Sequence, residues 1–265
     1  MHPILFKIGP VEVRSYGVML ALSFIIGIYL AGRKAEKIGI DKKYIYDLSV
    51  YLMIGAILGA RLTYVVLHLS DFYGNWLAVI NPFHDGELVG IAGMNMLGGV
   101  IGAFLLAVIY IVKHNLKFLQ IADLLTPYLA LGTGITRIGC FLNGCCFGRP
   151  TECGCGIVFP EGSIPDYIFH NIPIHPTQLY SSLNGFFMFV VLLYIDKKKK
   201  IDGVTFLSWV ILYSIFRFFI DFIRYYEDAM NLFYIGNTPI TANQGICVLM
   251  IILGIAGIYY LRKNR

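Results

Sequence analysis

Reactive and charged side chains gather in one short segment of an otherwise apolar chain. The stretch RIGCFLNGCCFGRPTECGCG, from Arg137 to Gly156, contains two arginines, one asparagine and five of the six cysteines in the sequence. Cysteine thiolates act as nucleophiles and metal ligands, and the guanidinium of arginine matches the geometry of phosphate. These residue types, so closely spaced, make the segment the first candidate for a site.

A second group of charges lies inside an apolar run near the C-terminus. In LYSIFRFFIDFIR, Tyr213, Arg217 and Asp221 are spaced four residues apart and Arg224 follows three residues later, so a helix places them on one face. Charges are costly in hydrocarbon and usually face a polar cavity. We expect Asp221 to hold Arg217 in position and to offset its charge.

Two further arginines, Arg61 and Arg137, also lie within or at the ends of apolar runs. Several arginines around one membrane cavity favour an anion, and the abundant phosphate of a bilayer is a lipid head group. The sequence therefore predicts a phospholipid-binding site. The alternative for each arginine is an internal ion pair or a side chain that snorkels to the interface.

Glycine and histidine add weaker signals. Small residues in GAILGAR and MLGGVIGAF are typical of close helix packing, but the adjacent pair Gly98–Gly99 also offers a backbone that a substrate can approach. In NIPIHPTQLY, His175 and Gln178 fall at the start of an apolar run, near the interface. A histidine there is equally suited to a structural role and to proton transfer.

Composition sets the class of the protein. Of 265 residues, 57% are hydrophobic and 14% are charged, which is far more apolar than an ordinary soluble domain. Seven runs are long enough to span a bilayer, and they cover roughly 16–33, 48–69, 92–112, 118–139, 177–195, 204–225 and 244–261. We predict an all-α polytopic membrane protein, one domain over 1–265, with a loop over 140–176.

Basic clusters predict how the spans are oriented. GRKAEKIGIDKK, KHNLK, KKKK and RKNR follow the first, third, fifth and seventh runs, so seven spans place all four clusters on one side. The positive-inside rule puts that side in the cytoplasm, with the N-terminus and the 140–176 loop outside. Because the net charge of +5 lies mostly in these clusters, we expect no nucleic-acid partner. Glu12 and Arg14 before the first run argue against a cleavable signal peptide.

The motifs together resemble one family. RIGCFLNGCCFGRP, HPTQLY, YSIFRFFIDFIR and NQG, in this order, are similar to prolipoprotein diacylglyceryl transferases, and SYG and GARLTY also fit. The resemblance implies a multi-pass enzyme of the bacterial inner membrane, without a cofactor or a metal. It implies transfer of the diacylglyceryl group of phosphatidylglycerol to the lipobox cysteine of a preprolipoprotein signal peptide, with release of glycerol phosphate.

The resemblance also assigns residues. The family's essential arginines correspond to Arg137 and Arg217, and its other site positions correspond to Tyr16, Asn143, Gly144, Gly148 and, usually as Glu, Asp221. Arg61, Gly98 and Gly99 complete the expected lipid site, and His175 or Tyr16 is the expected proton relay. Where the family commonly has His or Tyr before the paired glycines, this chain has Leu97, and where many members have Asn it has Cys140.

Several alternatives remain open at the level of the sequence. The expected nucleophile is the thiol of the substrate, so Cys145, Cys146, Cys153 and Cys155 are expected to form disulfides or to be free structural thiols. Their spacing fits no common zinc pattern, and a metal site or an acyl-cysteine intermediate is the alternative. A paralogue with altered chemistry, or a transporter or flippase of an anionic lipid, is the alternative function.

Overall fold

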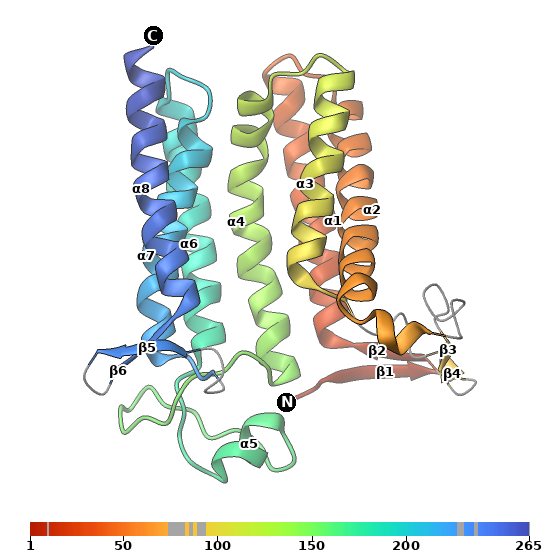
Figure 1. The fold of residues 1–265 in the computed structure, drawn as a ribbon, viewed down its shortest axis with the longest axis vertical. Helices are drawn as coiled ribbons and strands as arrows, with labels where there is room; N and C mark the ends of the chain where they lie inside the picture. Colours follow the sequence, from red (N-terminus) through yellow and green to blue (C-terminus); the bar gives the residue numbers. More distant parts are fainter. Residues whose placement is uncertain are drawn as a thin grey trace. The chain divides into compact units, whose positions relative to one another are not determined.

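A computed structural model describes residues 1–9, 11–73, 83–84, 87–88, 94–226, 231–235 and 238–264. Seven of its helices are long and apolar enough to cross a membrane. They are α1 Ser15–Lys37, α2 Lys42–Leu67, α3 Met96–Lys113, α4 Phe118–Asn143, α6 Thr177–Lys198, α7 Val204–Ile223 and α8 Ala242–Lys263. The predicted seven-span helical membrane class is confirmed (Figure 1).

Six of the seven helices extend beyond at least one end of the apolar run from which they were predicted, whereas α7 ends two residues before the predicted end at 225. α2 begins six residues before the predicted run at 48, because Asp41 caps it by accepting a hydrogen bond from the backbone N–H of Lys43 (2.8 Å). α4 continues to Asn143, past the predicted end at 139. The first two residues of the run predicted at 92–112 lie outside the described residues.

The surface of the spans is apolar. Between 17% and 39% of the most apolar window of each span is buried. Large side chains such as Val66 on α2, Phe187 on α6 and Phe219 on α7 are therefore mostly exposed. Continuous apolar surface of this extent is not stable against water, so it is the surface that faces lipid.

Short elements accompany the spans. In the part of the chain that the structure describes, three hairpins pair β1 Ile4–Ile8 with β2 Val11–Arg14, β3 Phe83–His84 with β4 Glu87–Leu88, and β5 Asn231–Ile235 with β6 Thr238–Thr241. A 3₁₀ helix covers Leu69–Phe72, and a six-residue helix, α5, covers Ile164–Phe169. The sequence analysis predicted none of these short elements, because each is too brief to show a hydrophobic period.

Contacts divide the chain into two compact units. Unit 1 contains Met1–Phe6, Val13–Gly27 and Ala122–Arg265, and unit 2 contains Lys7–Glu12 and Ile28–Ile121. This division concerns the density of contacts. The expectation of one domain over 1–265 therefore stays a prediction. Each unit has its own helix packing.

Unit 2 is organised by α2 and α3. A Cβ built on Gly59 would lie 2.3 Å from the carbonyl oxygen of Gly98, and one built on Gly55 would lie 2.5 Å from that of Gly102. The backbones of the two helices are thus close enough to exclude any side chain at these positions. This is the small-residue packing typical of membrane helices.

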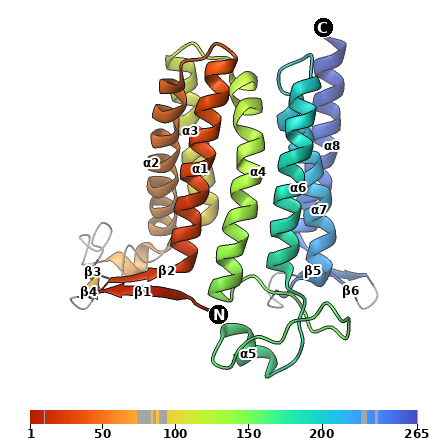
Figure 2. The same cartoon turned by 180° about the vertical axis from the view of Figure 1, so that it is seen from behind.

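Unit 1 contains α4, α6, α7 and α8, which lie alongside one another in both views (Figures 1 and 2). α4 and α6 approach closely at Gly134 and Gly185, and the hydroxyl of Ser182 donates to the carbonyl of Gly134 (2.8 Å). The loop that joins α4 to α6 carries α5 and lies at the end of the unit where α4 finishes and α6 begins. This end collects most of the candidate site residues.

Candidate active site

The C-terminal end of α4 turns back on itself and brings three thiols together. The backbone N–H of Cys145 donates to the carbonyl of Cys140 (3.1 Å) and that of Gly144 to Phe141 (3.2 Å), the paired bonds of a Schellman cap. Gly144 has φ of +76°, which glycine adopts without steric cost. The Sγ atoms of Cys140, Cys145 and Cys146 consequently lie within 4.8 Å of one another.

The start of α6 fixes the backbone of this turn. The hydroxyl of Thr177 donates to the carbonyl of Cys146 (2.8 Å), and the side-chain amide of Gln178 donates to the carbonyl of Cys145 (2.9 Å). Both α6 side chains are almost fully buried. Sequence reasoning had placed Gln178 at the interface but had given neither residue a role. Their contacts explain the polar start of this span.

Arg137 and Tyr16 lie beside the three thiols. Arg137 donates a hydrogen bond to the thiol of Cys146, and the hydroxyl of Tyr16 interacts electrostatically with Arg137 and the thiols. A Cβ on Gly139 would lie 3.2 Å from the Cα of Tyr16, so the start of α1 packs directly on the end of α4. The structure therefore gathers these two predicted site residues at the end of α4.

Two more predicted residues belong to the same turn. The side chain of Asn143 hydrogen-bonds the thiol of Cys145, and Gly144 supplies the left-handed cap. Gly148 lies further along, where a Cβ would come within 2.6 Å of the carbonyl oxygen of His175. Its N–H donates to that same oxygen (2.9 Å), so Gly148 is required for close backbone packing.

The polar face of α7 forms a second cluster. The guanidinium of Arg217 lies 3.2 Å from a carboxylate oxygen of Asp221, so the pairing expected from the four-residue spacing is present. The hydroxyl of Tyr226 donates to the same oxygen (2.8 Å) and also contacts Arg217. The hydroxyl of Thr241 donates to the other oxygen (3.0 Å). Asp221 is thereby fully satisfied although its side chain is inaccessible to solvent.

Sequence reasoning missed Tyr226 and Thr241. Tyr226 follows the end of α7, and Thr241 caps α8 with the reciprocal bonds of a capping box to Gln244. Burial raises the pKa of Tyr226, so its hydroxyl keeps its proton at neutral pH and remains a donor to Asp221. Besides the spacing of Arg217 and Asp221, the polar NQG that opens α8 is a sequence signal near this network.

Arg224 lies at the end of α7 and connects the two clusters electrostatically. Its guanidinium stacks over the ring of Tyr226 (5.3 Å to the centroid). Hydrogen bonds from the thiols of Cys140 and Cys145 lower the pKa of Cys146, and the charges of Arg224 and Arg137 lower it further. Cys146 is thus the thiol of the three that is favoured as thiolate.

The cysteines of the loop separate into two groups. Cys153 and Cys155 form a disulfide, whereas Cys145 and Cys146 are free thiols grouped with Cys140. Cys145, Cys146, Cys153 and Cys155, the alternative metal site of the sequence analysis, are therefore not one cluster. The ring of His175 lies 3.5 Å from the hydroxyl of Tyr180 and 3.9 Å from the sulfur of Cys155. Proton transfer by His175 remains a prediction.

Unit 2 contains the remaining predicted residues. The guanidinium of Arg61 stacks over Tyr64 (5.7 Å) and Phe72 (5.3 Å). Gly98 and Gly99 are buried against α2, and this packing accounts for both of them, so a substrate contact at their backbone remains a prediction. The side chain of Leu97 is 66% exposed at the start of α3.

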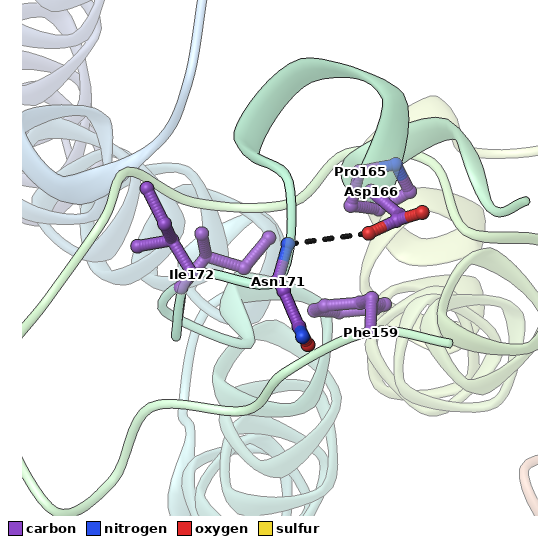
Figure 3. Close-up of a pocket in the computed structure, with 6 residues that line it drawn as sticks. Phe159, Pro165, Asp166, Asn171 and Ile172 are labelled. Atoms are coloured by element: carbon purple, nitrogen blue, oxygen red, sulfur yellow. Dashed lines mark hydrogen bonds between the residues drawn. The ribbon is translucent and has the colours of Figure 1, made fainter. Parts of the chain in front are cut away.

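A small hollow lies beside α5 (Figure 3). Asp166 accepts the backbone N–H groups of Asn171 (3.2 Å) and Gly162 (3.1 Å) at its edge. The empty space of the hollow, counted together with the open solvent at its mouth, is only about 150 Å³. Pockets that hold small molecules usually enclose about 300–1,000 Å³, so this hollow reflects how the loop folds.

The loop itself is ordered by aromatic packing. The ring of Phe147 stacks on Tyr225 (5.7 Å between centroids), and Phe169 meets Tyr225 edge to face (5.1 Å). Phe159 and Ile174 complete a buried cluster with Phe147. Because this cluster holds the loop against the end of α7, the thiols and arginines of unit 1 have fixed neighbours.

Seven apolar spans, with arginines and thiols gathered at helix ends in unit 1, define a polytopic membrane protein. The family comparison gives the class a name. Residues 3–260 match the prolipoprotein diacylglyceryl transferase family, and the chain belongs to that family. It is therefore an enzyme of the transferase class.

Relatives with an assigned name are similar in sequence to almost the whole chain. A phosphatidylglycerol–prolipoprotein diacylglyceryl transferase of Clostridium tetani is 31% identical over 96% of this chain and 96% of its own length. Relatives of the same name from Campylobacter hominis (33%, covering 99% and 91%) and Oceanobacillus iheyensis (34%, covering 97% and 87%) are similar. The fold and the site thus lie within the matched region.

Proposed function

We propose that this protein transfers the diacylglyceryl group of phosphatidylglycerol to the thiol of a lipobox cysteine in a preprolipoprotein. This is the first step of bacterial lipoprotein maturation. Family membership and the names of the relatives support the two substrates. The spans support a lipid bilayer as the place where both substrates meet the enzyme.

One observation in the site carries the proposal. The Nε of Arg224 is buried and has no hydrogen-bond partner among the residues that the structure describes, and Arg137 lies in the same electrostatic neighbourhood. A buried charged donor without a partner is costly. A phosphate oxygen would satisfy it, and Arg217, already oriented by Asp221, offers a further fork of donors.

The reaction requires one bond to form and one to break. The thiolate sulfur of the peptide attacks the glycerol carbon that carries the phosphate ester, and the carbon–oxygen bond breaks. The leaving glycerol phosphate takes the electron pair of that bond. Arg137 and Arg217 stabilise the charge that develops on the phosphate, as preorganised donors do in other active sites. Asn143, Gly144 and Gly148, all in unit 1, shape the lipid site.

The substrate thiol must lose its proton. Either a base accepts that proton, or nearby positive charge stabilises the thiolate. Leu97 offers neither a base nor a hydrogen-bond donor. Tyr16, which lies beside Arg137, and His175 are the proposed relays within unit 1. We place the enzyme in the bacterial inner membrane with the 140–176 loop outside, as the basic clusters predict.

A reconstituted transfer assay tests the function. Purified protein is incubated with phosphatidylglycerol vesicles and a lipobox peptide, and the mass of the peptide is measured. We expect the mass to rise by one diacylglyceryl group, and a peptide with serine in place of the cysteine to remain unchanged. Release of glycerol phosphate should match the modified peptide in amount.

The alternatives give different outcomes in the same assay. A transporter or flippase of an anionic lipid moves a labelled lipid between leaflets and leaves the peptide mass unchanged. A paralogue with altered chemistry consumes phosphatidylglycerol but gives another product. Either result would replace the proposed transferase reaction.

A further inference from the structure

The three thiols at the end of α4 form a preorganised group of soft ligands. Cys140 belongs to the last turn of α4, and Cys145 and Cys146 follow the Schellman cap. Their sulfur atoms lie within 4.8 Å of one another. Thr177 and Gln178 clamp the two carbonyls that follow the cap, so the backbone of the group is held from a second helix.

This spacing suits a tetrahedral metal ion. A zinc–sulfur bond of about 2.3 Å puts the sulfurs of one tetrahedral site about 3.8 Å apart. Moving the sulfurs together by about 1 Å or less, through side-chain rotation, reaches that geometry. Thiolate is the ligand that selects zinc and other soft ions over hard ones.

The surroundings provide the charge that such a site needs. Three thiolates and one divalent ion carry a net charge of −1, which is costly at the edge of a membrane unless it is paired. Arg137, which hydrogen-bonds Cys146, and Arg224 interact electrostatically with this group. Two cations beside the group allow a fourth anionic ligand as well.

We propose that Cys140, Cys145 and Cys146 bind one zinc ion as thiolates, and that the fourth coordination position of the ion accepts the thiol of the lipobox cysteine. The identity of the fourth ligand rests on the proposed function, whereas the three-thiolate site does not. Catalytic zinc sites typically have three protein ligands and one open position. The hydroxyl of Tyr16 and the guanidinium of Arg137 interact electrostatically with thiols of the same group.

The ion would replace the missing base. A thiol that coordinates zinc loses its proton outright, so the peptide sulfur becomes a bound thiolate and its proton passes to solvent. The sulfur then forms its bond to the glycerol carbon while the carbon–oxygen bond breaks and glycerol phosphate leaves with the electron pair. Zinc keeps its oxidation state throughout. A base at position 97, where this chain has Leu97, is then unnecessary.

Metal content tests the three-thiolate site independently of activity. The full chain is purified in detergent under anaerobic, reducing conditions, and zinc per chain is measured by mass spectrometry. We expect one equivalent in the wild type and in Cys247→Ser, which removes the buried free cysteine of α8. Cys140→Ser and Cys146→Ser should each lose most of it. A wild-type protein without zinc that also takes up none when it is supplied would overturn the proposal.

Cobalt substitution tests the geometry without relying on the variants to fold. Wild-type protein loaded with Co²⁺ should show the intense visible bands of a tetrahedral ion and a thiolate-to-cobalt charge-transfer band in the near ultraviolet. Bands of an octahedral ion, or a disulfide among the three cysteines that persists under reducing conditions, would contradict the site.

A peptide titration then tests the open position. The lipobox peptide should strengthen the charge-transfer band of the Co²⁺ protein, because a fourth sulfur joins the ion, and the serine peptide should leave the band unchanged. If both peptides leave it unchanged, the proposed fourth ligand is wrong. If the band responds but the phosphatidylglycerol assay yields no thioether, the zinc site stands and the proposed function fails.

Discussion

At the scale of single residues, the arginines of unit 1 are the best-defined functional groups. Arg217 is held by Asp221 and Tyr226, and Arg137 is held beside Cys146. An arginine fixed by neighbours loses less entropy when it binds phosphate than a mobile one. We therefore expect Arg137 and Arg217 to contribute more to the rate of transfer than an arginine on the surface.

Removing either arginine should lower the rate of transfer while the protein still inserts. Arg137→Ala and Arg217→Ala each remove a charged donor to the leaving phosphate, a loss worth about 2.7–4 kcal/mol or roughly 10²–10³ in kcat. Initial rates from the peptide mass assay measure the effect. Arg33→Ala, at an exposed arginine that stacks on Tyr29, is the matched control and should retain its rate.

A lysine variant separates charge from geometry. Arg217→Lys keeps the positive charge but lacks the planar fork that binds two oxygens, so we expect a loss intermediate between wild type and Arg217→Ala. Near-normal turnover of both alanine variants would contradict the anion site. A lysine variant as active as wild type would contradict only the bidentate contact.

The sequence predicts these residues unequally. The pairing of Arg217 with Asp221 follows from helical spacing, because residues four apart share a face. Tyr226 and Thr241 lie beyond the end of α7, where no periodicity predicts what they meet. The thiol cluster depends on the turn after Asn143, and the glycine at 144 is the only local sign of that turn. Tertiary contacts thus decide most of the site.

At the scale of elements, the start of α7 depends on a residue of another helix. Gly203, the N-cap of α7, has no side chain to accept the free N–H groups. The buried carboxylate of Asp123 on α4 accepts the N–H of Gly203 (2.7 Å) and of Phe206 (2.8 Å) and pairs with Lys199 (2.6 Å). Asp123 on the fourth span is therefore a cap for the sixth span, α7.

Asp123→Ala should destabilise unit 1. Removing one partner of a buried ion pair typically costs about 3–5 kcal/mol, and the effect here should fall toward the lower value because Lys199 also pairs with Asp196 (3.1 Å). The apparent Tm in one detergent at one scan rate measures the change. Glu36→Ala, which breaks an exposed pair with Lys42 (2.8 Å), should leave Tm unchanged. Equal apparent Tm values for Asp123→Ala and Glu36→Ala would contradict the role of Asp123 as the cap of α7.

The packing of α2 on α3 should be intolerant of a methyl group. In Gly59→Ala the new Cβ would meet the carbonyl oxygen of Gly98 at 2.3 Å, so the helices must separate. Overpacking of this kind typically costs about 1–3 kcal/mol. Gly245→Ala on α8, where no heavy atom lies within 4 Å of the new Cβ, is the control. An unchanged Tm for Gly59→Ala would show that α2 and α3 pack less closely in solution than in the structure.

At the scale of the whole molecule, the spans were predictable because each needs a long apolar run, and seven such runs stand out in the sequence. The ends of the helices were less predictable. α1 and α2 continue into basic and polar residues, where capping and contacts, and not hydropathy, determine the boundary. The division into two units has no counterpart in composition, since both contain the same kind of apolar helix.

The orientation of the chain is the last prediction. Basic clusters follow α1, α3, α6 and α8, which are the first, third, fifth and seventh spans. If all seven helices cross the membrane, the four clusters lie on the same side of it. The positive-inside rule then places these clusters in the cytoplasm and the α4–α6 loop, with its disulfide, on the oxidising side. Reporter fusions after Lys200 and after Arg265 should both read cytoplasmic, and a fusion within the loop, after Gly162, should read external. Fusions after Lys200 and Arg265 on opposite sides would mean that α7 and α8 do not both span.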